Sequence, residues 1–409
     1  MFKKLHETKV MRDPVHGYIH VEYEVIWNCI NAKWFQRLRR IRQLGGAYMV
    51  YHTADHTRFA HSLGVYEIVR RMVNEVPDIK NALNEKEKVT AMVAGLLHDL
   101  GHGPFSHTFE ALAHSSHEEY TCRIIEEDPE ISGILNSCEK GLAKEVADVI
   151  RHQSKNPILP QLVSSQLDAD RMDYLLRDAY FTGTKYGEFD LERILRTLRV
   201  ADNRIVVKES GVYAVENYIM ARYHMYWQVY YHPVERSYET ILHKCFMRLR
   251  DLHKLGKCPK TIPELNALIA GKKLTLDEYY VLDEYACSYG ISLLMKAKDK
   301  ILRDLATRII NRQLFDYEEN NPSSSRRIKA ILKKHGYDPK YYFAKDEVAQ
   351  RPYVPYRYRN EMGNGIWVRV HGGKIEEISK ASGIVHSLVQ GQVLKDDRIY
   401  YPKEIKDKK

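Results

Sequence analysis

The sequence has no pair of closely spaced cysteines. Its six cysteines are scattered through 409 residues, and no two of them stand in a Cys-x-x-Cys spacing. That absence argues against a zinc ribbon and against a disulfide framework, since both need regularly spaced cysteines. We therefore expect six unpaired thiols, which is typical of a protein in the reducing cytoplasm.

Long apolar runs are missing as well. No run approaches the roughly 20 residues that a membrane-spanning helix needs, and the first ten residues, MFKKLHETKV, lack the apolar stretch of a secretion signal. Internal repeats and long low-complexity tracts are also absent. With 44% hydrophobic and 29% charged residues, the composition is that of a soluble protein, and we expect no membrane partner.

The charge balance is basic. Sixty-three lysines and arginines stand against 54 acidic residues, which gives a formal net charge of +9. A positive protein attracts polyanions, so nucleic acids and small phosphorylated substrates both qualify, and net charge does not separate them. The 29 tyrosines could stack on bases, but tyrosines at helical spacing are typical of plain packing. Nucleic-acid binding is thus compatible with the composition but not required by it.

Amphipathic helical patterning dominates from about residue 30 to residue 310. It is interrupted by a predicted strand pair that turns at Glu209–Gly211, and it ends at a predicted surface loop or linker, residues 317–327. Beyond that linker, alternating apolar positions around Gly372–Gly373 predict strands. We therefore predict a mainly α fold with three parts. They are an amino-terminal segment (residues 1–50), a helical core (residues 51–316) and a smaller α+β carboxy-terminal region (residues 328–409).

The stretch GLLHDLGHGPFSH, Gly95 to His107, concentrates polar chemistry in an apolar setting. Three histidines and an aspartate fall within thirteen residues. The apolar run before them predicts a buried helix that delivers His98 and Asp99 at its end, where glycines and a proline stop it. A buried histidine beside a buried carboxylate is costly unless a charged or hydrogen-bonded partner compensates it. The stretch therefore predicts a bound group.

Two further places supply potential metal ligands. One is His61 in RFAHSLGV, and the other is an aspartate in LDADRMDYLLRD, where two carboxylates stand one residue apart. Together with His98 and Asp99 they make a set of two nitrogen and two oxygen ligands, which suits Fe, Mn, Zn or similar ions.

In this order, the residues resemble the HD superfamily of metal-dependent phosphohydrolases, which carries an H…HD…D signature. The resemblance is closest to its deoxynucleoside triphosphate (dNTP) triphosphohydrolases, and it spans roughly the first 230 residues. The matching stretches are DPVHGYI (Asp13–Ile19), FQRLRRIRQLGGAYMVY (Phe35–Tyr51), RFAHSLGV (Arg58–Val65), HDLGHGPFSH (His98–His107), DADRMDYLLRD (Asp168–Asp178) and RYHMYWQVYYH (Arg222–His232). The resemblance implies that the predicted core is an HD helical bundle.

The resemblance implies a divalent metal ion (Fe, Mn, Zn or Mg) held by His61, His98, Asp99 and Asp170. The family pattern uses the second aspartate of DAD, and helical geometry agrees. Asp170, Tyr174 and Asp178 recur every four residues and share a face, whereas Asp168 lies roughly 160° around the helix from Asp170.

Four residues are implied to be catalytic: His102, His107, Glu110 and His117. In the resembling enzymes the position of His117 faces the α-phosphate as acid or base. An acid orients it, and this acid is Glu110 here where the family has aspartate.

Substrate contacts are implied for a larger group of residues. Arg58, on the helical face of His61, and Arg171 resemble phosphate clamps. The remaining substrate contacts implied by the resemblance are Gln43 and Leu44 as readers of the sugar, Tyr174 and Asp178 completing that sugar pocket, and Arg222 and Tyr230 as phosphate and base contacts.

An effector site is implied by Lys9, Val10, Gln36 and Arg39, which match a family pocket where subunits meet. The family residue that reads guanine is an aspartate, and Asn31 stands there, although an amide cannot accept two N–H donors as a carboxylate does. We expect GTP or dGTP as the effector and a homotetramer as the assembly.

The expected activity is hydrolysis of a dNTP to a deoxynucleoside and intact triphosphate. One alternative is another HD phosphohydrolase that acts on nucleoside monophosphates, cyclic nucleotides or guanosine polyphosphates. Another is a basic nucleic-acid binder with a relic site. The sugar-reading QLGG segment with Tyr174 and Asp178 disfavours the first, and the complete ligand set disfavours the second.

Overall fold

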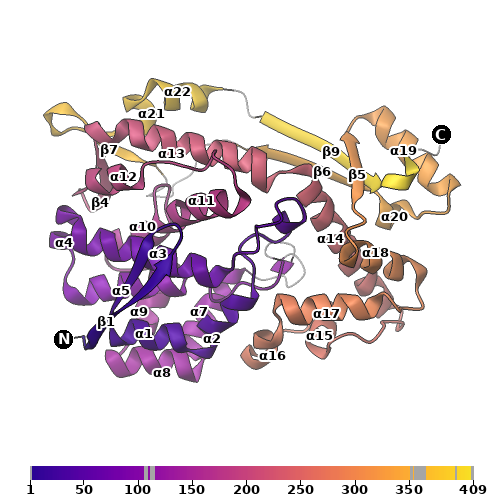
Figure 1. Ribbon diagram of the computed structural model, residues 1–409, viewed down its shortest axis with the longest axis horizontal. Helices are drawn as coiled ribbons and strands as arrows, with labels where there is room; N and C mark the ends of the chain where they lie inside the picture. The colour runs from indigo at the N-terminus through magenta and orange to yellow at the C-terminus, as the bar shows by residue number, and fades with distance from the viewer. Residues whose placement is uncertain are drawn as a thin grey trace.

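The computed structural model describes residues 2–105, 109–110, 116–350, 353, 365–391 and 394–406. Helices make up most of it (Figure 1), so the predicted mainly α fold is confirmed. In this part of the chain all six cysteines are free thiols, as expected. No helix among these residues is long and apolar enough to cross a membrane.

The amino-terminal half is a helical bundle edged by a hairpin. The hairpin pairs β1 (Lys4–Asp13) with β2 (Gly17–Tyr23) in antiparallel register. The helices that follow are α1 (Glu24–Asn31), α2 (Lys33–Arg37), α3 (Arg58–Glu75), α4 (Pro77–Ala82), α5 (Glu85–Leu97), α7 (His117–Glu127), α8 (Pro129–Cys138), α9 (Leu142–Ile150), α10 (Ile158–Val163), α11 (Ala169–Thr182) and α12 (Leu191–Thr197).

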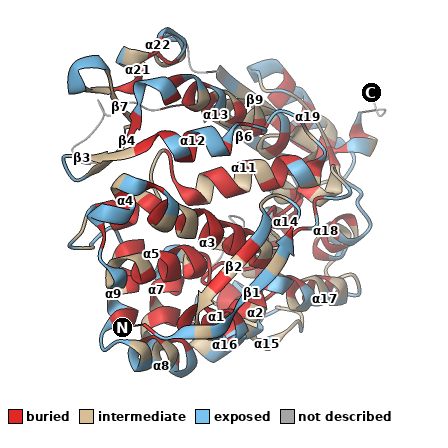
Figure 2. Ribbon diagram, turned by 60° about the vertical axis from the view of Figure 1, so that its left-hand side comes forward, coloured by how far each residue is buried: buried red, intermediate tan, exposed pale blue. Residues whose placement is uncertain are grey.

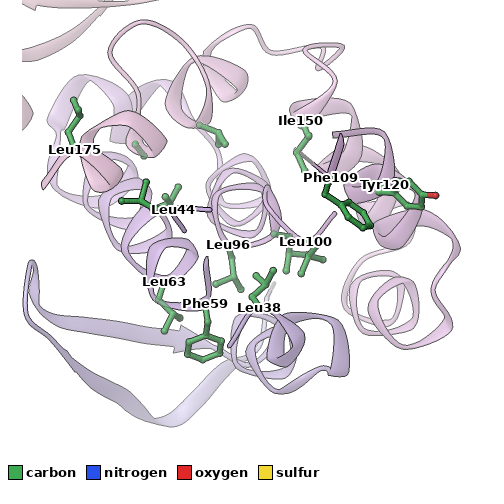
Figure 3. Packing of buried hydrophobic residues seen from close by; sticks show 14 of the residues in the cluster. Leu38, Leu44, Phe59, Leu63, Leu96, Leu100, Phe109, Tyr120, Ile150 and Leu175 are labelled. Carbon is green, nitrogen blue, oxygen red and sulfur yellow. The ribbon is translucent and has the colours of Figure 1, made fainter. Parts of the chain in front are cut away.

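Helices α3 and α5 lie at the centre of this bundle. Both are buried on nearly every side, because apolar or small residues occupy successive positions rather than a single stripe. A capping box between Asn84 and Glu87 starts α5, and the helix ends at Leu97, directly before His98. Figure 3 shows Leu63 of α3 and Leu96 of α5 near Leu38 and Leu100 in the packed interior. The predicted buried helix before the His–Asp pair is therefore confirmed.

The carboxy-terminal half adds helices and two sheets. Its helices are α13 (Val212–Met225), α14 (Pro233–Lys254), α15 (Pro263–Ile269), α16 (Leu276–Val281), α17 (Glu284–Leu294), α18 (Lys300–Ile310), α19 (Pro322–Lys334), α20 (Pro339–Tyr342), α21 (Ile378–Ala381) and α22 (Gly383–Gln390). A π-helical turn, η4 (Tyr226–Tyr230), joins α13 to α14. The strands are β3 (Leu198–Ala201), β4 (Arg204–Lys208), β5 (Phe315–Glu319), β6 (Ala344–Gln350), β7 (Trp367–Arg369), β8 (Ile375–Glu377) and β9 (Leu394–Pro402).

The two sheets connect distant parts of the sequence. One has the order β3-β4-β7-β8, in which β7 runs parallel to β4, and the other has the order β5-β9-β6. The predicted carboxy-terminal region thus completes a sheet that begins within the predicted core. The buried residues form one continuous cluster through both halves (Figure 2).

Two local predictions are wrong. The strand pair turns at Asp202 and Asn203, both with positive φ, whereas Glu209–Gly211 is a short helical turn before α13. Residues 317–327 are not a linker, because all of them except Asn320 and Asn321 lie in β5 or α19. The Asn-Pro-Ser sequence begins a helix, since the Asn321 side chain caps α19 and proline occupies the first turn.

Candidate active site

The four predicted ligands lie together although they come from three separate segments. His61 is in the first turn of α3, His98 and Asp99 directly follow α5, and Asp170 is in the first turn of α11. His61 Nε2 lies 3.1 Å from Asp170 Oδ1 and 3.8 Å from Asp99 Oδ2. His98 Nε2 lies 3.3 Å from Asp99 Oδ1 and 3.7 Å from Asp170 Oδ1. Two imidazoles and two carboxylates therefore converge on one small space.

Both imidazoles are oriented as in metal-ligating histidines, with one ring nitrogen engaged and the other facing the cluster. His61 Nδ1 lies 2.7 Å from Asp173 Oδ2, and His98 Nδ1 lies 2.9 Å from the carbonyl oxygen of Gly95. The Nε2 atom of His98 is buried and has no hydrogen-bond partner among the described residues. The donor set thus fits a divalent cation with nitrogen and oxygen ligands.

Asp168, the other carboxylate of the DAD sequence, stabilises the start of α11. It is the N-cap of α11, and it accepts hydrogen bonds from the backbone N–H of Arg171 at 2.6 Å and of Ser165 at 2.5 Å. Its side chain is fully buried and also pairs with the Arg171 guanidinium. The structure therefore brings Asp170, and not Asp168, to the two histidines.

A second layer of charged residues supports His61. Asp173 accepts from the guanidinium of Arg177 through two bonds of 2.9 Å, and His16 Nε2 lies 2.6 Å from its Oδ1. Arg177 also donates to Asp13 at 2.9 Å. Burial raises the pKa of Asp173, but Arg177 and the bonds with His16 and His61 outweigh burial and hold that pKa well below its usual range. The ionised form of Asp173 is thus favoured, and its Oδ2 holds the His61 ring by the contact with Nδ1.

This supporting layer was not predicted from the sequence. Its residues, Asp13, His16, Asp173 and Arg177, lie in the DPVHGYI and DRMDYLLRD stretches, for which only the metal and substrate residues were predicted. A signal was present in the spacing, because Asp173 and Arg177 are four residues apart and share a helix face.

Gly64, in the RFAHSLGV stretch of α3, faces the buried ion pair of α11. A Cβ atom at this position would lie 1.8 Å from Asp173 Oδ1 and 2.5 Å from Arg177 Nη2. Only glycine lets α3 approach the buried ion pair of α11 so closely.

We expect Gly64→Ala to cost about 3–5 kcal/mol of unfolding free energy, the scale for breaking a buried ion pair. Gly133→Ala in α8 is the matched control, because a Cβ there meets nothing within 4 Å and alanine favours a helix by about 1 kcal/mol over glycine. Denaturant titration of both variants measures the difference. Equal stability of the two would contradict the packing argument.

His102 and His117 form a stacked pair beside the ligand cluster. Their ring centroids are 3.8 Å apart with planes 15° from parallel, and His102 Nε2 lies 3.3 Å from Asp99 Oδ1. Glu110 accepts from the backbone N–H of His117 at 3.2 Å, and it makes a short hydrogen bond with His117 Nδ1. The glutamate therefore reaches His117. Burial and Arg58 keep the pKa of His102 well below its ordinary value, so that ring is neutral.

His107, which was predicted to be catalytic with these residues, lies outside the described residues.

Gly101 permits the close approach of α7, which carries His117. A Cβ atom at Gly101 would lie 2.1 Å from the His117 carbonyl oxygen and 2.3 Å from the Thr121 nitrogen, so a larger residue would push α7 away.

Three arginines are predicted to contact phosphate, and one of them, Arg58, pairs with a ligand of the cluster. Arg58 Nη1 lies 2.5 Å from Asp99 Oδ2, and Arg222 donates to Gln166 Oε1 at 2.9 Å. Arg171 and Arg222 each keep a buried Nε atom that has no hydrogen-bond partner in the described part of the chain. Buried donors in proteins are normally paired, so these atoms point to a ligand.

The predicted sugar-reading residues come from two segments, the one before α3 and helix α11. Gln43 and Leu44 are buried, and Gln43 Oε1 lacks a partner within the described ranges. Asp178 is bonded to Tyr230 and to His56, a residue that the sequence analysis did not single out. The ring of Tyr174 packs edge-on against that of Tyr230, with centroids 6.1 Å apart.

The predicted effector residues lie at the amino-terminal edge. Val10 is exposed on β1, beside Lys9. Arg39 donates to Gln36 Oε1 at 2.9 Å, and its guanidinium lies 3.5 Å from the centroid of the Phe59 ring. Asn31, at the end of α1, donates to the Trp27 carbonyl oxygen.

Comparison with known protein families identifies the family to which this chain belongs. Residues 58–178 match the HD domain, and residues 189–262 match the HD associated region. The first match begins at Arg58, ends at Asp178 and contains all four clustered ligands. The chain belongs to the HD-domain phosphohydrolase family. The predicted resemblance is thereby confirmed.

Three known proteins are similar to this HD phosphohydrolase over most of its length. The uncharacterized protein YwfO of Bacillus subtilis is 47% identical over 98% of this chain and 94% of its own length. The human deoxynucleoside triphosphate triphosphohydrolase SAMHD1 is 30% identical, over 78% of this chain and 56% of that protein. A crystal structure of a phosphohydrolase from Bacteroides thetaiotaomicron superposes with a TM-score of 0.86 and 29% identity, covering 97% of this chain and all of that one.

Proposed function

We propose that this HD phosphohydrolase hydrolyses dNTPs to a deoxynucleoside and intact triphosphate. A divalent metal ion (Fe, Mn, Zn or Mg) would be held by His61, His98, Asp99 and Asp170. One observation carries the proposal. Around these ligands, Gln43 Oε1, His102 Nδ1, Arg171 Nε and Arg222 Nε are buried without a partner among the described residues. Buried polar atoms need partners, and guanidinium groups beside a cation suit a chain of phosphates.

The reaction divides between the metal and the side chains. A bound divalent ion would polarise a phosphate and orient the attacking water. The phosphates are bound by three arginines, Arg58, Arg171 and Arg222. Water attacks the α-phosphorus of the bound substrate, and the bond from phosphorus to the 5′-oxygen breaks. Glu110 holds Nδ1 of His117, which leaves Nε2 to exchange a proton as acid toward the 5′-oxygen or as base toward the water.

The sugar is selected in our account by Gln43, Leu44, Tyr174 and Asp178. Leu44 forms a wall that leaves no room for a 2′-hydroxyl, and burying that hydroxyl without a partner costs about 1–3 kcal/mol.

We expect Leu44→Ala to relax the preference for deoxyribose by about ten- to a hundredfold, because it opens space for the 2′-hydroxyl. Gln43→Ala should instead weaken turnover of the dNTP itself. Ratios of kcat/KM for a dNTP and its ribonucleotide, measured in both variants, provide the test. An unchanged ratio in Leu44→Ala would place sugar selection elsewhere, with Tyr174 the next candidate.

A substrate panel tests the proposed function against its alternatives. The pure protein with Mn²⁺ is incubated separately with dNTPs, nucleoside monophosphates, cyclic nucleotides and guanosine polyphosphates, and the products are separated. We expect turnover of dNTPs. Turnover of another class alone would assign the site to a different HD phosphohydrolase. Binding of single-stranded nucleic acid with no hydrolysis at all would support a binding protein.

We also propose that a guanine nucleotide, GTP or dGTP, activates the enzyme at Lys9, Val10, Gln36 and Arg39 within a homotetramer. Arg39 packs on Phe59, which lies between Arg58 and His61 on α3, so its position is linked to the catalytic helix. An effector acts only if it binds the active form better than the inactive one.

Arg39→Ala should therefore lose stimulation by the effector and keep basal metal binding. Rates with and without GTP or dGTP are compared in wild type and variant, beside sedimentation of each. If no nucleotide changes the wild-type rate, the enzyme is constitutive and this part of the proposal fails.

A further inference from the structure

His56 lies outside the metal cluster and yet contacts both halves of the proposed sugar pocket. Its side chain is 1% exposed, and its Nε2 lies 2.7 Å from Asp178 Oδ1. Its backbone carbonyl oxygen accepts a hydrogen bond of 3.0 Å from the N–H of Gln43. One residue therefore joins the segment before α3 to the third turn of α11.

The donor in the contact with Asp178 is the imidazole, because a carboxylate only accepts. The other oxygen of Asp178 accepts from the hydroxyl of Tyr230 at 2.8 Å. A carboxylate offers about four lone-pair sites. The two hydrogen bonds from His56 and Tyr230 therefore fix the orientation of Asp178 and leave other lone pairs free to accept. Asp178 is thus held from two sides and can still accept from a ligand hydroxyl.

The His56 ring is itself held in one orientation. It stacks on Phe181 with centroids 4.7 Å apart and planes 12° from parallel. Its Nδ1 atom is buried and makes no hydrogen bond to any described residue. Among the described residues, the His56 ring therefore makes its hydrogen bond to Asp178 and to no other side chain.

We propose that His56 is a positioning residue that sets Asp178 to accept the 3′-hydroxyl of the deoxyribose, and that it fixes Gln43 of the same pocket through its backbone. The inference rests on the proposed function. It assigns a task to His56 that acts through Asp178, so the loss of His56 should be felt only by substrates that carry a 3′-hydroxyl.

Two variants separate the hydrogen bond from the packing. His56→Phe keeps an aromatic ring on Phe181 and removes the donor. His56→Gln gives up the stack but places an amide N–H where Nε2 stood. Each is tested with dGTP and with its 2′,3′-dideoxy analogue, both by kcat/KM with Mn²⁺ and by calorimetric Kd with Ca²⁺. Thermal unfolding of each variant is recorded first.

Wild type should prefer dGTP to the dideoxy analogue. In His56→Phe, kcat/KM for dGTP should fall about ten- to a hundredfold, mainly because KM and Kd rise, and the values for the analogue should change little. His56→Gln should recover part of that loss. An equal loss on both nucleotides, or a preserved preference, overturns the inference. If His56→Phe does not fold, Phe181→Leu replaces it, with a smaller loss in the same direction expected and an unchanged preference overturning the inference.

The binding arm separates this inference from the proposed function. Wild type that binds dGTP better than the analogue, but hydrolyses neither, leaves the role of His56 standing and overturns the dNTP hydrolase. Wild type that hydrolyses both equally well overturns the role of His56 alone. Wild type that binds neither nucleotide overturns both.

Discussion

Asp170→Ala should lose both the bound metal and all measurable hydrolysis, because Asp170 is the carboxylate of α11 that lies near the Nε2 atoms of both His61 and His98. Removing it leaves two imidazoles and Asp99, and the open side cannot be closed by Asp168. That carboxylate is fully buried and is occupied by the first turn of its own helix.

Asp168→Asn is the matched control for this prediction. Asparagine caps a helix about as well as aspartate, so α11 should keep its start and the metal should stay bound, although the charge that pairs with Arg171 is lost. Elemental analysis of both purified variants gives the metal content directly. Metal in Asp170→Ala equal to that of wild type would refute the ligand assignment.

His117→Ala should keep the metal and lose about a hundred- to ten-thousandfold in kcat, the range typical of a general acid or base. Glu110→Gln should lose less in the same direction, because it removes the charge that orients the ring but not the ring itself. Comparison of kcat with metal content in each variant separates catalysis from metal loss. Normal turnover by His117→Ala would exclude this histidine from the chemistry.

Short-range sequence patterns predicted some parts of the site, and the family resemblance predicted the ligands that lie far apart in the sequence. The helix that ends at Leu97 follows from an apolar run stopped by glycines. The choice of Asp170 over Asp168 follows from the family pattern, with which helical geometry agrees. Both concern residues within a few positions of one another, where the backbone period dictates which side chains share a face. Structure and helical pattern agree there.

The supporting network could not be predicted in this way. His16 meets Asp173 across 157 positions, and Asp13 meets Arg177 across 164. Local periodicity contains no information on such pairs. Local periodicity also could not predict the pairing of β7 with β4, two strands that lie far apart in the sequence. Nor could it predict the role of His56, which depends on the contact of its side chain with Asp178.

The wrong linker prediction has a different cause. An Asn-Pro-Ser-Ser-Ser run suggests a loop by composition, but each of its residues is also favoured at a helix start. Only the apolar residues after it, Ile328 and Leu332, which are buried in the hydrophobic cluster, decide between the two.

The identity of the phosphorus product tests the central claim most directly. Wild-type protein with Mn²⁺ and a dNTP is followed by phosphorus NMR from the first turnover. Attack at the α-phosphorus predicts that inorganic triphosphate appears together with the deoxynucleoside, with no early pyrophosphate or orthophosphate. Stepwise release of orthophosphate, or of pyrophosphate with a nucleoside monophosphate, would contradict a dNTP triphosphohydrolase.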